Sequence, residues 1–177
     1  MVRHAQVFRD KQGINLLTGH CAEDTNPGKR TVAGSTVDGG EFEFPYDRLL
    51  IATGSTAVKP EIPGVDLPGV FVLKDLSDGR KIKEFLKATT VKNAVIIGMG
   101  YIALEMCESL VGLNIAVEMV KPNPVFLPWL EPSMAQVIKP ELEAKGVGIY
   151  AGHAVERIEK TADGLQVNCR DLTLSAD

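Results

Sequence analysis

The sequence contains little cysteine and no spacing that suits a metal. Its three cysteines are Cys21, Cys107 and Cys169, and they form neither a CxxC pair nor a Cys/His ligand pattern. Isolated cysteines of this kind are typical of reduced thiols in a cytoplasmic protein. The longest apolar stretch, Ala94–Met106, is interrupted by glycines and a glutamate and is too short for a bilayer, which takes about 20 residues. We therefore expect no metal site and no membrane span.

The chain also lacks an excess of basic charge. The net charge is −4 over 177 residues, and charges of both signs are mixed along the sequence. Nucleic-acid binders need a basic patch that neutralises phosphates, so we expect no nucleic-acid partner. The opening Met1–Asp10 is polar and charged, which predicts no signal peptide and a cytoplasmic location. The length fits one or two domains.

The first third of the chain is typical of short β-strands. A continuous apolar run, Asp47–Thr53, predicts a further strand that is buried on both faces. The stretch Val58–Gly69 contains three prolines and predicts a loop, so we place a domain boundary there, between residues 1–59 and 60–177. Turn residues at Asn26–Gly28 and Asp38–Gly40 separate the three early runs. These runs are Ile14–Cys21, Lys29–Thr36 and Glu41–Phe44.

The second part of the chain alternates strands and helices. Leu76–Ala88 predicts an amphipathic helix, and the tail after residue 153 predicts three short strands with a turn at Asp163 and Gly164. The order between them is β-α-β-α-β, which predicts an α/β fold with a parallel sheet of Rossmann type. The elements of that unit are Asn93–Gly98, Tyr101–Gly112, Ile115–Val120, Ser133–Gly146 and Val147–Gly152.

A glycine-rich turn joins the first of these strands to its helix. It matches the G-x-G-x-x-G/A pattern of dinucleotide-binding folds. Gly98 allows the tight turn, Gly100 lets a pyrophosphate approach the backbone, and Ala103 lets the helix pack on the strand. The helix start then faces the phosphates with free N–H groups. The alternative is a glycine-rich turn without a ligand. The six predicted residues are Gly98, Met99, Gly100, Tyr101, Ile102 and Ala103.

The residue at the end of the second strand bears on the choice between NAD and NADP. An acidic side chain there binds the ribose hydroxyls of NAD, whereas a basic one accommodates a 2′-phosphate. Lys121 occupies this position, so the sequence slightly favours NADPH over NADH. The alternative is a solvated lysine. The following loop, Pro122–Pro128, is predicted to wrap the adenosine.

Four segments of the chain resemble one known family, in the order in which that family carries them. The segment GMGYIALE resembles the GxGYIGxE signature of FAD-dependent pyridine nucleotide-disulfide oxidoreductases. The resemblance is strongest to coenzyme A-disulfide reductases and NADH oxidases. The other three segments are YDRLLIATGS (Tyr46–Ser55), IPGVDLPGVF (Ile62–Phe71) and FLPWLEPSMA (Phe126–Ala135).

The resemblance implies a flavoprotein reaction in which hydride passes from NAD(P)H to FAD and on to a disulfide, peroxide or oxygen. It implies that Thr53 and Gly54 lie beside FAD, that Tyr101 covers the flavin, and that Glu105 contacts the nicotinamide or its ribose. A homodimeric parent protein is implied as well. The family's first FAD-binding unit and its C-terminal dimerisation domain have no counterpart here, and no cysteine matches a redox position. We therefore expect a central fragment that binds FAD weakly or not at all.

Three functional hypotheses follow for the chain. It is part of an NAD(P)H oxidoreductase, or a dinucleotide-binding module without turnover of its own, or a nucleotide sensor, which fold alone does not exclude. Turnover with an artificial electron acceptor favours the first hypothesis. A ligand-dependent change in assembly favours the third. No catalytic residue is predicted within the chain itself.

Overall fold

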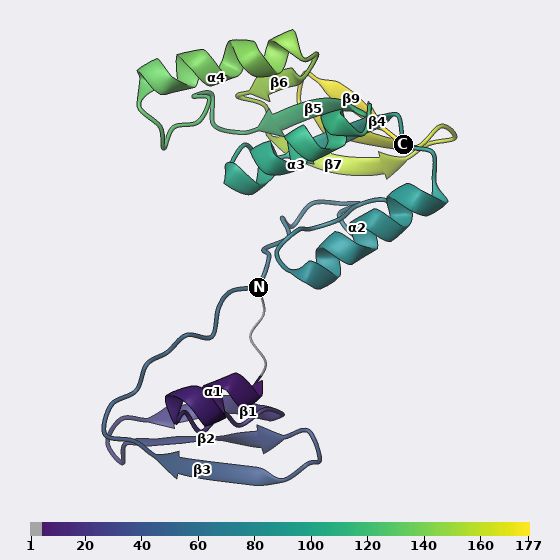
Figure 1. Ribbon diagram of the computed structural model, residues 1–177. Helices are drawn as coiled ribbons and strands as arrows, with labels where there is room; N and C mark the ends of the chain where they lie inside the picture. Colours follow the sequence, from purple (N-terminus) through teal and green to yellow (C-terminus); the bar gives the residue numbers. More distant parts are fainter. Residues whose placement is uncertain (1–4) are drawn as a thin grey trace. The chain divides into compact units, whose positions relative to one another are not determined.

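The computed structural model describes residues 5–177 (Figure 1). Residues 1–4, which belong to the polar opening and to the predicted first domain, lie outside the described residues. The chain divides into two compact units that meet at Gly54 and Ser55. The sequence places the boundary between residues 59 and 60. Each unit is described by itself.

The first unit contains one helix and an antiparallel sheet of order β1-β2-β3. The turn between β2 and β3 is closed by a hydrogen bond from Thr36 N–H to the Gly40 carbonyl, as the Asp38–Gly40 signal predicted. Helix α1 was not predicted, and the first strand begins at His20 rather than Ile14, directly after a turn at Thr18 and Gly19. The elements are α1 (Ala5–Gln12), β1 (His20–Asn26), β2 (Thr31–Thr36) and β3 (Glu41–Pro45).

The prediction of a buried strand over Asp47–Thr53 is wrong. No strand is present over this segment, and the Leu50 side chain is 87% exposed. Ile51 is exposed as well. A strand forms only where neighbouring strands accept its backbone hydrogen bonds. Within the described residues no strand pairs with Asp47–Thr53, so the apolar composition of this run does not by itself make it a strand.

The second unit contains the predicted parallel sheet. The sheet has the order β4-β5-β6, and Ile97 lies opposite Val120 in its register. Helix α2 starts with a capping box in which Asp75 and Asp78 exchange side-chain and backbone hydrogen bonds. Helices α2 and α3 have the predicted bounds. The elements are α2 (Leu76–Ala88), β4 (Asn93–Ile97), α3 (Tyr101–Gly112), β5 (Ala116–Lys121), α4 (Pro132–Ala144) and β6 (Gly148–Ala151).

An antiparallel meander follows the parallel sheet and confirms the three predicted tail strands. These strands are β7 (Val155–Lys160), β8 (Leu165–Cys169) and β9 (Thr173–Ala176). The Thr161 N–H donates to the Gly164 carbonyl in the predicted turn. The carboxylate of Asp177, after β9, accepts hydrogen bonds from the backbone N–H groups of Lys92 and Asn93 at 2.6 and 2.8 Å. The end of the meander is thereby attached to the start of β4.

The alternation of side chains along β5 explains the layered core. Val117 and Met119 are buried in one apolar cluster with Cys107 and Leu110 of α3. Val120 points the other way and is buried in a second cluster with residues of β7, β8 and β9. Successive strand residues face opposite sides of a sheet. The parallel sheet is therefore covered by α3 on one face and by the meander on the other (Figure 1).

The proline-rich loop Val58–Gly69 forms neither helix nor strand, as predicted. The Ile158 N–H donates to the Pro63 carbonyl at 2.8 Å, so the loop is attached to β7. Gly64 next to it has φ +86° and its Cα faces the Ile158 carbonyl, where a Cβ atom would overlap the oxygen. Only glycine fits this contact without strain.

Candidate functional site

The glycine-rich turn lies between β4 and α3, at the carboxyl end of the parallel strands. The Gly98 N–H donates to the Val120 carbonyl at 2.8 Å, which fixes the turn beside the end of β5. Gly98 has φ +122°, a conformation that favours glycine. Met99 is buried in the apolar core and thereby attaches the turn to it. Ligands of open α/β sheets bind outside this edge of the strands.

The space above the turn is open. Apart from the immediate chain neighbours, no heavy atom of the described residues lies within 4 Å of a Cβ atom built on Gly98 or on Gly100. Gly100 is the N-cap of α3, and no side chain of the described residues caps that helix. The first turn of α3 also carries no acidic side chain. Free N–H groups at an uncapped helix start favour an anion, so the turn fits a pyrophosphate.

The first turn of α3 distributes its side chains between core and surface. Ala103 packs against the apolar core, as its predicted role requires. Tyr101 is 66% exposed and Ile102 is exposed as well. Glu105 is exposed, with its backbone carbonyl accepting a hydrogen bond from the Ser109 hydroxyl. The side chains of residues 101, 102 and 105 are thus available to a ligand.

Lys121 ends β5, but its side chain is only 8% exposed. Its ammonium donates to the Val125 carbonyl at 2.9 Å, and the Asn123 side chain accepts a hydrogen bond from the Val125 N–H at 2.8 Å. Leu127, with φ +49°, is fully buried. These contacts hold the loop Pro122–Pro128 in one conformation beside the glycine-rich turn.

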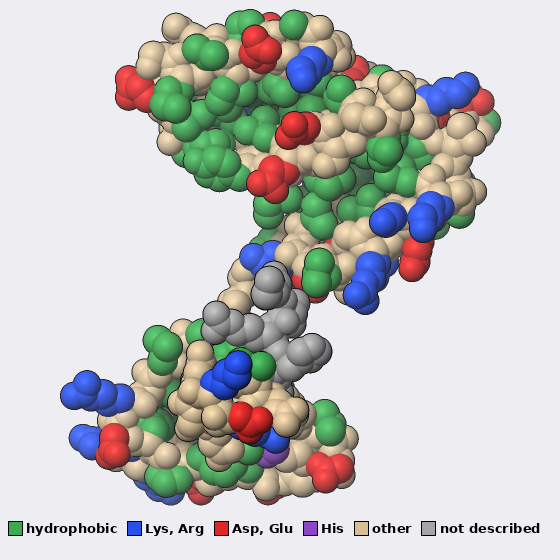
Figure 2. All heavy atoms as spheres, in the orientation of Figure 1, with side chains coloured by type: hydrophobic (Ala, Val, Ile, Leu, Met, Phe, Trp, Pro, Cys, Tyr) green, Lys and Arg blue, Asp and Glu red, His purple; other side chains and the backbone are tan. Residues whose placement is uncertain are grey.

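Sequence reasoning missed the contact between Tyr101 and Trp129. Their ring centroids are 4.0 Å apart with an interplanar angle of 42°, and Trp129 is 40% exposed. The signal for it was a lone tryptophan directly after the loop Pro122–Pro128. Figure 2 shows apolar side chains gathered between α3 and α4. In the sequence from β4 to α4, the exposed apolar side chains include Ile97, Ile102, Val125, Met134 and Val137.

Comparison with known proteins agrees with this geometry. A family model described as pyridine nucleotide-disulphide oxidoreductase matches residues 2–176. The chain belongs to this family. A NADH oxidase of Methanocaldococcus jannaschii is 32% identical to it over 152 residues, which are 85% of this chain and 34% of that protein. The chain therefore spans roughly a third of the length of such relatives.

Solved structures of similar proteins have the same architecture. A NAD-dependent persulfide reductase from A. fulgidus is 31% identical and superposes with a TM-score of 0.86, over 99% of this chain and 32% of that one. An FAD-dependent pyridine nucleotide-disulphide oxidoreductase from Desulfovibrio vulgaris is 29% identical, with a TM-score of 0.68 over 89% of this chain and 41% of that one. The prediction of family and of fold class is confirmed.

The two residues that the family resemblance assigns to FAD lie in the first unit. Thr53 and Gly54 are exposed, and Gly54 has φ +73° with no described atom near the position of a Cβ. One hydroxyl and one open turn contact only a small part of a flavin dinucleotide. Thr53 and Gly54 alone thus do not enclose FAD.

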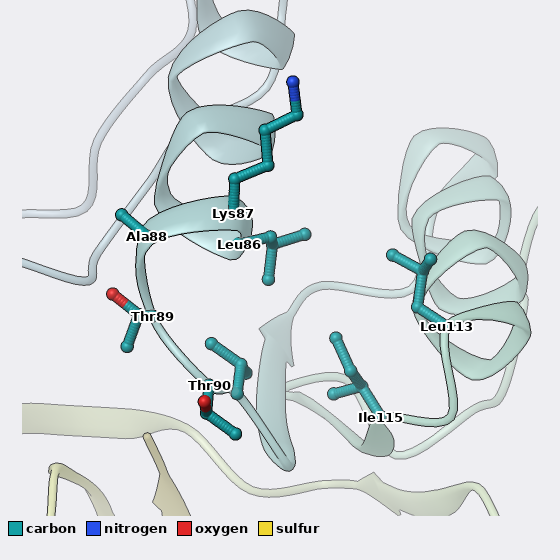
Figure 3. A pocket seen from close by; sticks show the side chains of 8 residues that line it. Leu86, Lys87, Ala88, Thr89, Thr90, Leu113 and Ile115 are labelled. Atoms are coloured by element: carbon teal, nitrogen blue, oxygen red, sulfur yellow. The ribbon is translucent and has the colours of Figure 1, made fainter.

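A separate pocket of about 350 Å³ lies at the other end of the parallel sheet (Figure 3). It is bounded by the end of α2 and by Val91, Leu113 and Ile115, which precede or flank the starts of β4 and β5. Figure 3 shows the Lys87 amine extending away from the apolar side chains. The lining also includes the hydroxyl-bearing side chains of Thr89 and Thr90.

Within residues 5–177, no three His, Cys, Asp or Glu side chains are grouped so as to hold a metal ion. No helix in the same range has the length and apolarity needed to cross a membrane.

Proposed function

We propose that this chain is the NAD(P)H-binding portion of a flavin-dependent oxidoreductase. One observation supports the proposal: the start of α3 has no side-chain cap and the space over Gly98 and Gly100 is open, as the approach of a pyrophosphate requires. The site occurs at the carboxyl end of a parallel sheet, in a chain that belongs to the pyridine nucleotide-disulphide oxidoreductase family. Tyr101 and Glu105 are exposed on the helix beyond it and are proposed to contact the nicotinamide end.

In the parent protein, the proposed reaction moves hydride from NAD(P)H to FAD and then to a disulfide, peroxide or oxygen. The names of similar proteins support this class of reaction, since they include a NADH oxidase and a NAD-dependent persulfide reductase. Thr53 and Gly54 are proposed to contribute the part of the FAD site that this chain holds. A cytoplasmic, homodimeric parent protein is part of the same proposal.

The preference for NADPH over NADH rests on Lys121. An ammonium group has three protons, and the bond to Val125 uses one of them, so two remain for a 2′-phosphate. The low exposure of the side chain means that a phosphate reaches it only if the loop Pro122–Pro128 shifts. The NADPH preference is therefore a proposal separate from dinucleotide binding itself.

A second candidate is a dinucleotide-binding module without turnover of its own. The exposure of Thr53 and Gly54 favours it for the isolated chain, since these two residues alone do not enclose a flavin. The two candidates predict different behaviour of the purified chain: whether it binds FAD, and whether it reduces an artificial electron acceptor.

The test is a calorimetric titration of the purified chain with NADPH, NADH and FAD in turn. We expect heat from both nicotinamide nucleotides, tighter binding of NADPH, and little or no heat from FAD. Tighter binding of NADH would reject the role of Lys121 while leaving the site in place. A purified chain that is yellow with stoichiometric flavin, or that reduces the acceptor with NADPH, would favour the enzyme over the module. No heat from either nicotinamide nucleotide would reject the proposed site.

A further inference from the structure

The loop after β5 rests on the residues that follow β6. The backbone N–H groups of Gly152 and His153 both donate to the Lys121 carbonyl, at 2.9 and 3.0 Å. A Cβ atom built on Gly152 lies 3.6 Å from the Pro124 Cβ, which is ordinary contact. The end of β6 thus supports both the end of β5 and the start of the loop Pro122–Pro128, which is predicted to wrap the adenosine.

The side chain of His153 attaches this support to the meander. Its Nδ1 lies 3.0 Å from Oδ1 of Asp171, which lies between β8 and β9. An ionised carboxylate only accepts hydrogen bonds, so Nδ1 carries the proton and donates it. The Tyr150 ring lies edge-on to the imidazole with the centroids 6.4 Å apart, and its hydroxyl donates to the Glu118 carboxylate at 3.2 Å. The imidazole is therefore held from two sides, and the His153 side chain is only 28% exposed.

We infer that His153, held by Asp171, is a positioning residue of the dinucleotide site. Strand β6 has four residues and lies at the edge of its sheet, so among the described strands only β5 pairs with it. The end of such a strand frays easily, and the bond between His153 and Asp171 gives it a second attachment. Through the Lys121 carbonyl and Pro124, this attachment fixes where the loop meets the adenosine end of a bound dinucleotide. The inference rests on the proposed function.

Asp171 allows positioning to be separated from charge, because the two predict opposite effects. Its side chain is 72% exposed, so Asp171→Ala should leave the fold intact. A carboxylate repels nearby phosphates, so if only its charge mattered, the variant would bind nucleotides as tightly as the unmodified chain or more tightly. If Asp171 positions the loop through His153, the variant binds them less tightly. Substitutions that act on a site through other residues change affinity about 2- to 30-fold.

The experiment is calorimetric titration of the purified chain and its variants with NADPH, NADH and ADP, with a urea unfolding curve for each variant. ADP carries the adenosine and pyrophosphate but no nicotinamide, so Asp171→Ala is expected to weaken all three ligands by a similar factor. Asp171→Asn keeps an oxygen that accepts the Nδ1 proton and is expected to restore most of the affinity. Asp163→Ala is the matched control, since it removes an exposed carboxylate from the turn between β7 and β8, and it is expected to bind normally.

A double substitution tests whether His153 and Asp171 act as one pair. His153→Leu removes the imidazole and is expected to weaken binding as much as Asp171→Ala does. The double variant is expected to bind no more weakly than either single variant, because the effects of two residues in one hydrogen bond do not add. Additive losses would contradict the inference. If His153→Leu fails to fold, the Asp171 variants decide the question alone.

The remaining outcomes differ in what they leave standing. If the unmodified chain binds the nucleotides and a folded Asp171→Ala variant binds them equally well or better, only this inference is wrong. The same holds if Asp171→Asn is as weak as Asp171→Ala, or if NADH binding is weakened and ADP binding is not. If the unmodified chain binds neither NADPH nor NADH, the proposed function fails and the inference fails with it.

Discussion

Gly100→Ala separates the folding role of the glycine-rich turn from its proposed binding role. Gly100 has φ −93° and ψ −175°, which alanine adopts without strain, and no described atom beyond its chain neighbours lies within 4 Å of the added Cβ. The new methyl group therefore disturbs nothing in the free protein. It does occupy the space in which a pyrophosphate would approach the start of α3.

The expected magnitudes follow from these two facts. Replacing glycine by alanine at an N-cap costs at most about 1 kcal/mol of stability, because neither side chain accepts a hydrogen bond. Each hydrogen bond to a charged group contributes about 1.5–3 kcal/mol. Losing one such bond to the pyrophosphate weakens binding about 10- to 150-fold. The variant should thus fold almost normally and bind NADH and NADPH poorly.

The assay is calorimetric titration with both nucleotides, together with a urea unfolding curve. Gly112→Ala is the matched control, since Gly112 ends the same helix and also has open space around it. That variant should bind normally and be as stable as the unmodified chain or slightly more so. Normal nucleotide affinity in a folded Gly100→Ala variant would refute the reasoning, because the pyrophosphate would then not approach Gly100.

Three further predictions concern stability and cofactor choice. Gly64→Ala should lower the free energy of unfolding by about 2–4 kcal/mol, because the positive φ and the overlap with the Ile158 carbonyl strain the loop; an unchanged urea midpoint would contradict this. Lys121→Met should weaken NADPH about 10-fold more than NADH, and an equal loss of both by calorimetry would assign Lys121 to holding the loop alone. Backbone N–H groups of Lys92 and then Asn93 lower the pKa of the Asp177 carboxyl below its ordinary value. The carboxylate therefore stabilises the fold above a pH of about 3.9, and this contribution is lost as the pH falls towards the lowered pKa, so Asp177→Asn should flatten the acid limb of the stability curve. If the stability of the variant fell with pH as steeply as that of the unmodified chain, this role of Asp177 would be wrong.

Local sequence signals predicted the second unit well. Apolar periodicity predicted α2, and the glycine-rich turn that opens it predicted α3, both with their observed bounds. The alternating order predicted the parallel sheet β4-β5-β6. The reason is that a capping box, a helix period and a glycine-rich turn are each specified by residues only a few positions apart. The glycine-rich turn was predicted at Gly98 and Gly100 for the same reason.

The first unit shows where local signals fail. The Leu-Leu-Ile run after Asp47 has the composition of a buried strand, but it is exposed because no described strand pairs with it. Whether an apolar run becomes a strand depends on partners that lie far away in the sequence. Helix α1, AQVFRDKQ, was missed since it is only 8 residues long and polar overall.

By itself the sequence determined that a βαβ unit with a glycine-rich turn is present, since turn glycines and helix starts act through neighbouring residues. Only the tertiary structure decided what surrounds that turn. It placed the Lys121 ammonium on the Val125 carbonyl and brought Trp129 against Tyr101, residues that are 28 positions apart in the chain. Such contacts depend on where β5 ends and on how the loop Pro122–Pro128 returns to the core. Both features follow from packing over the whole unit rather than from any local pattern.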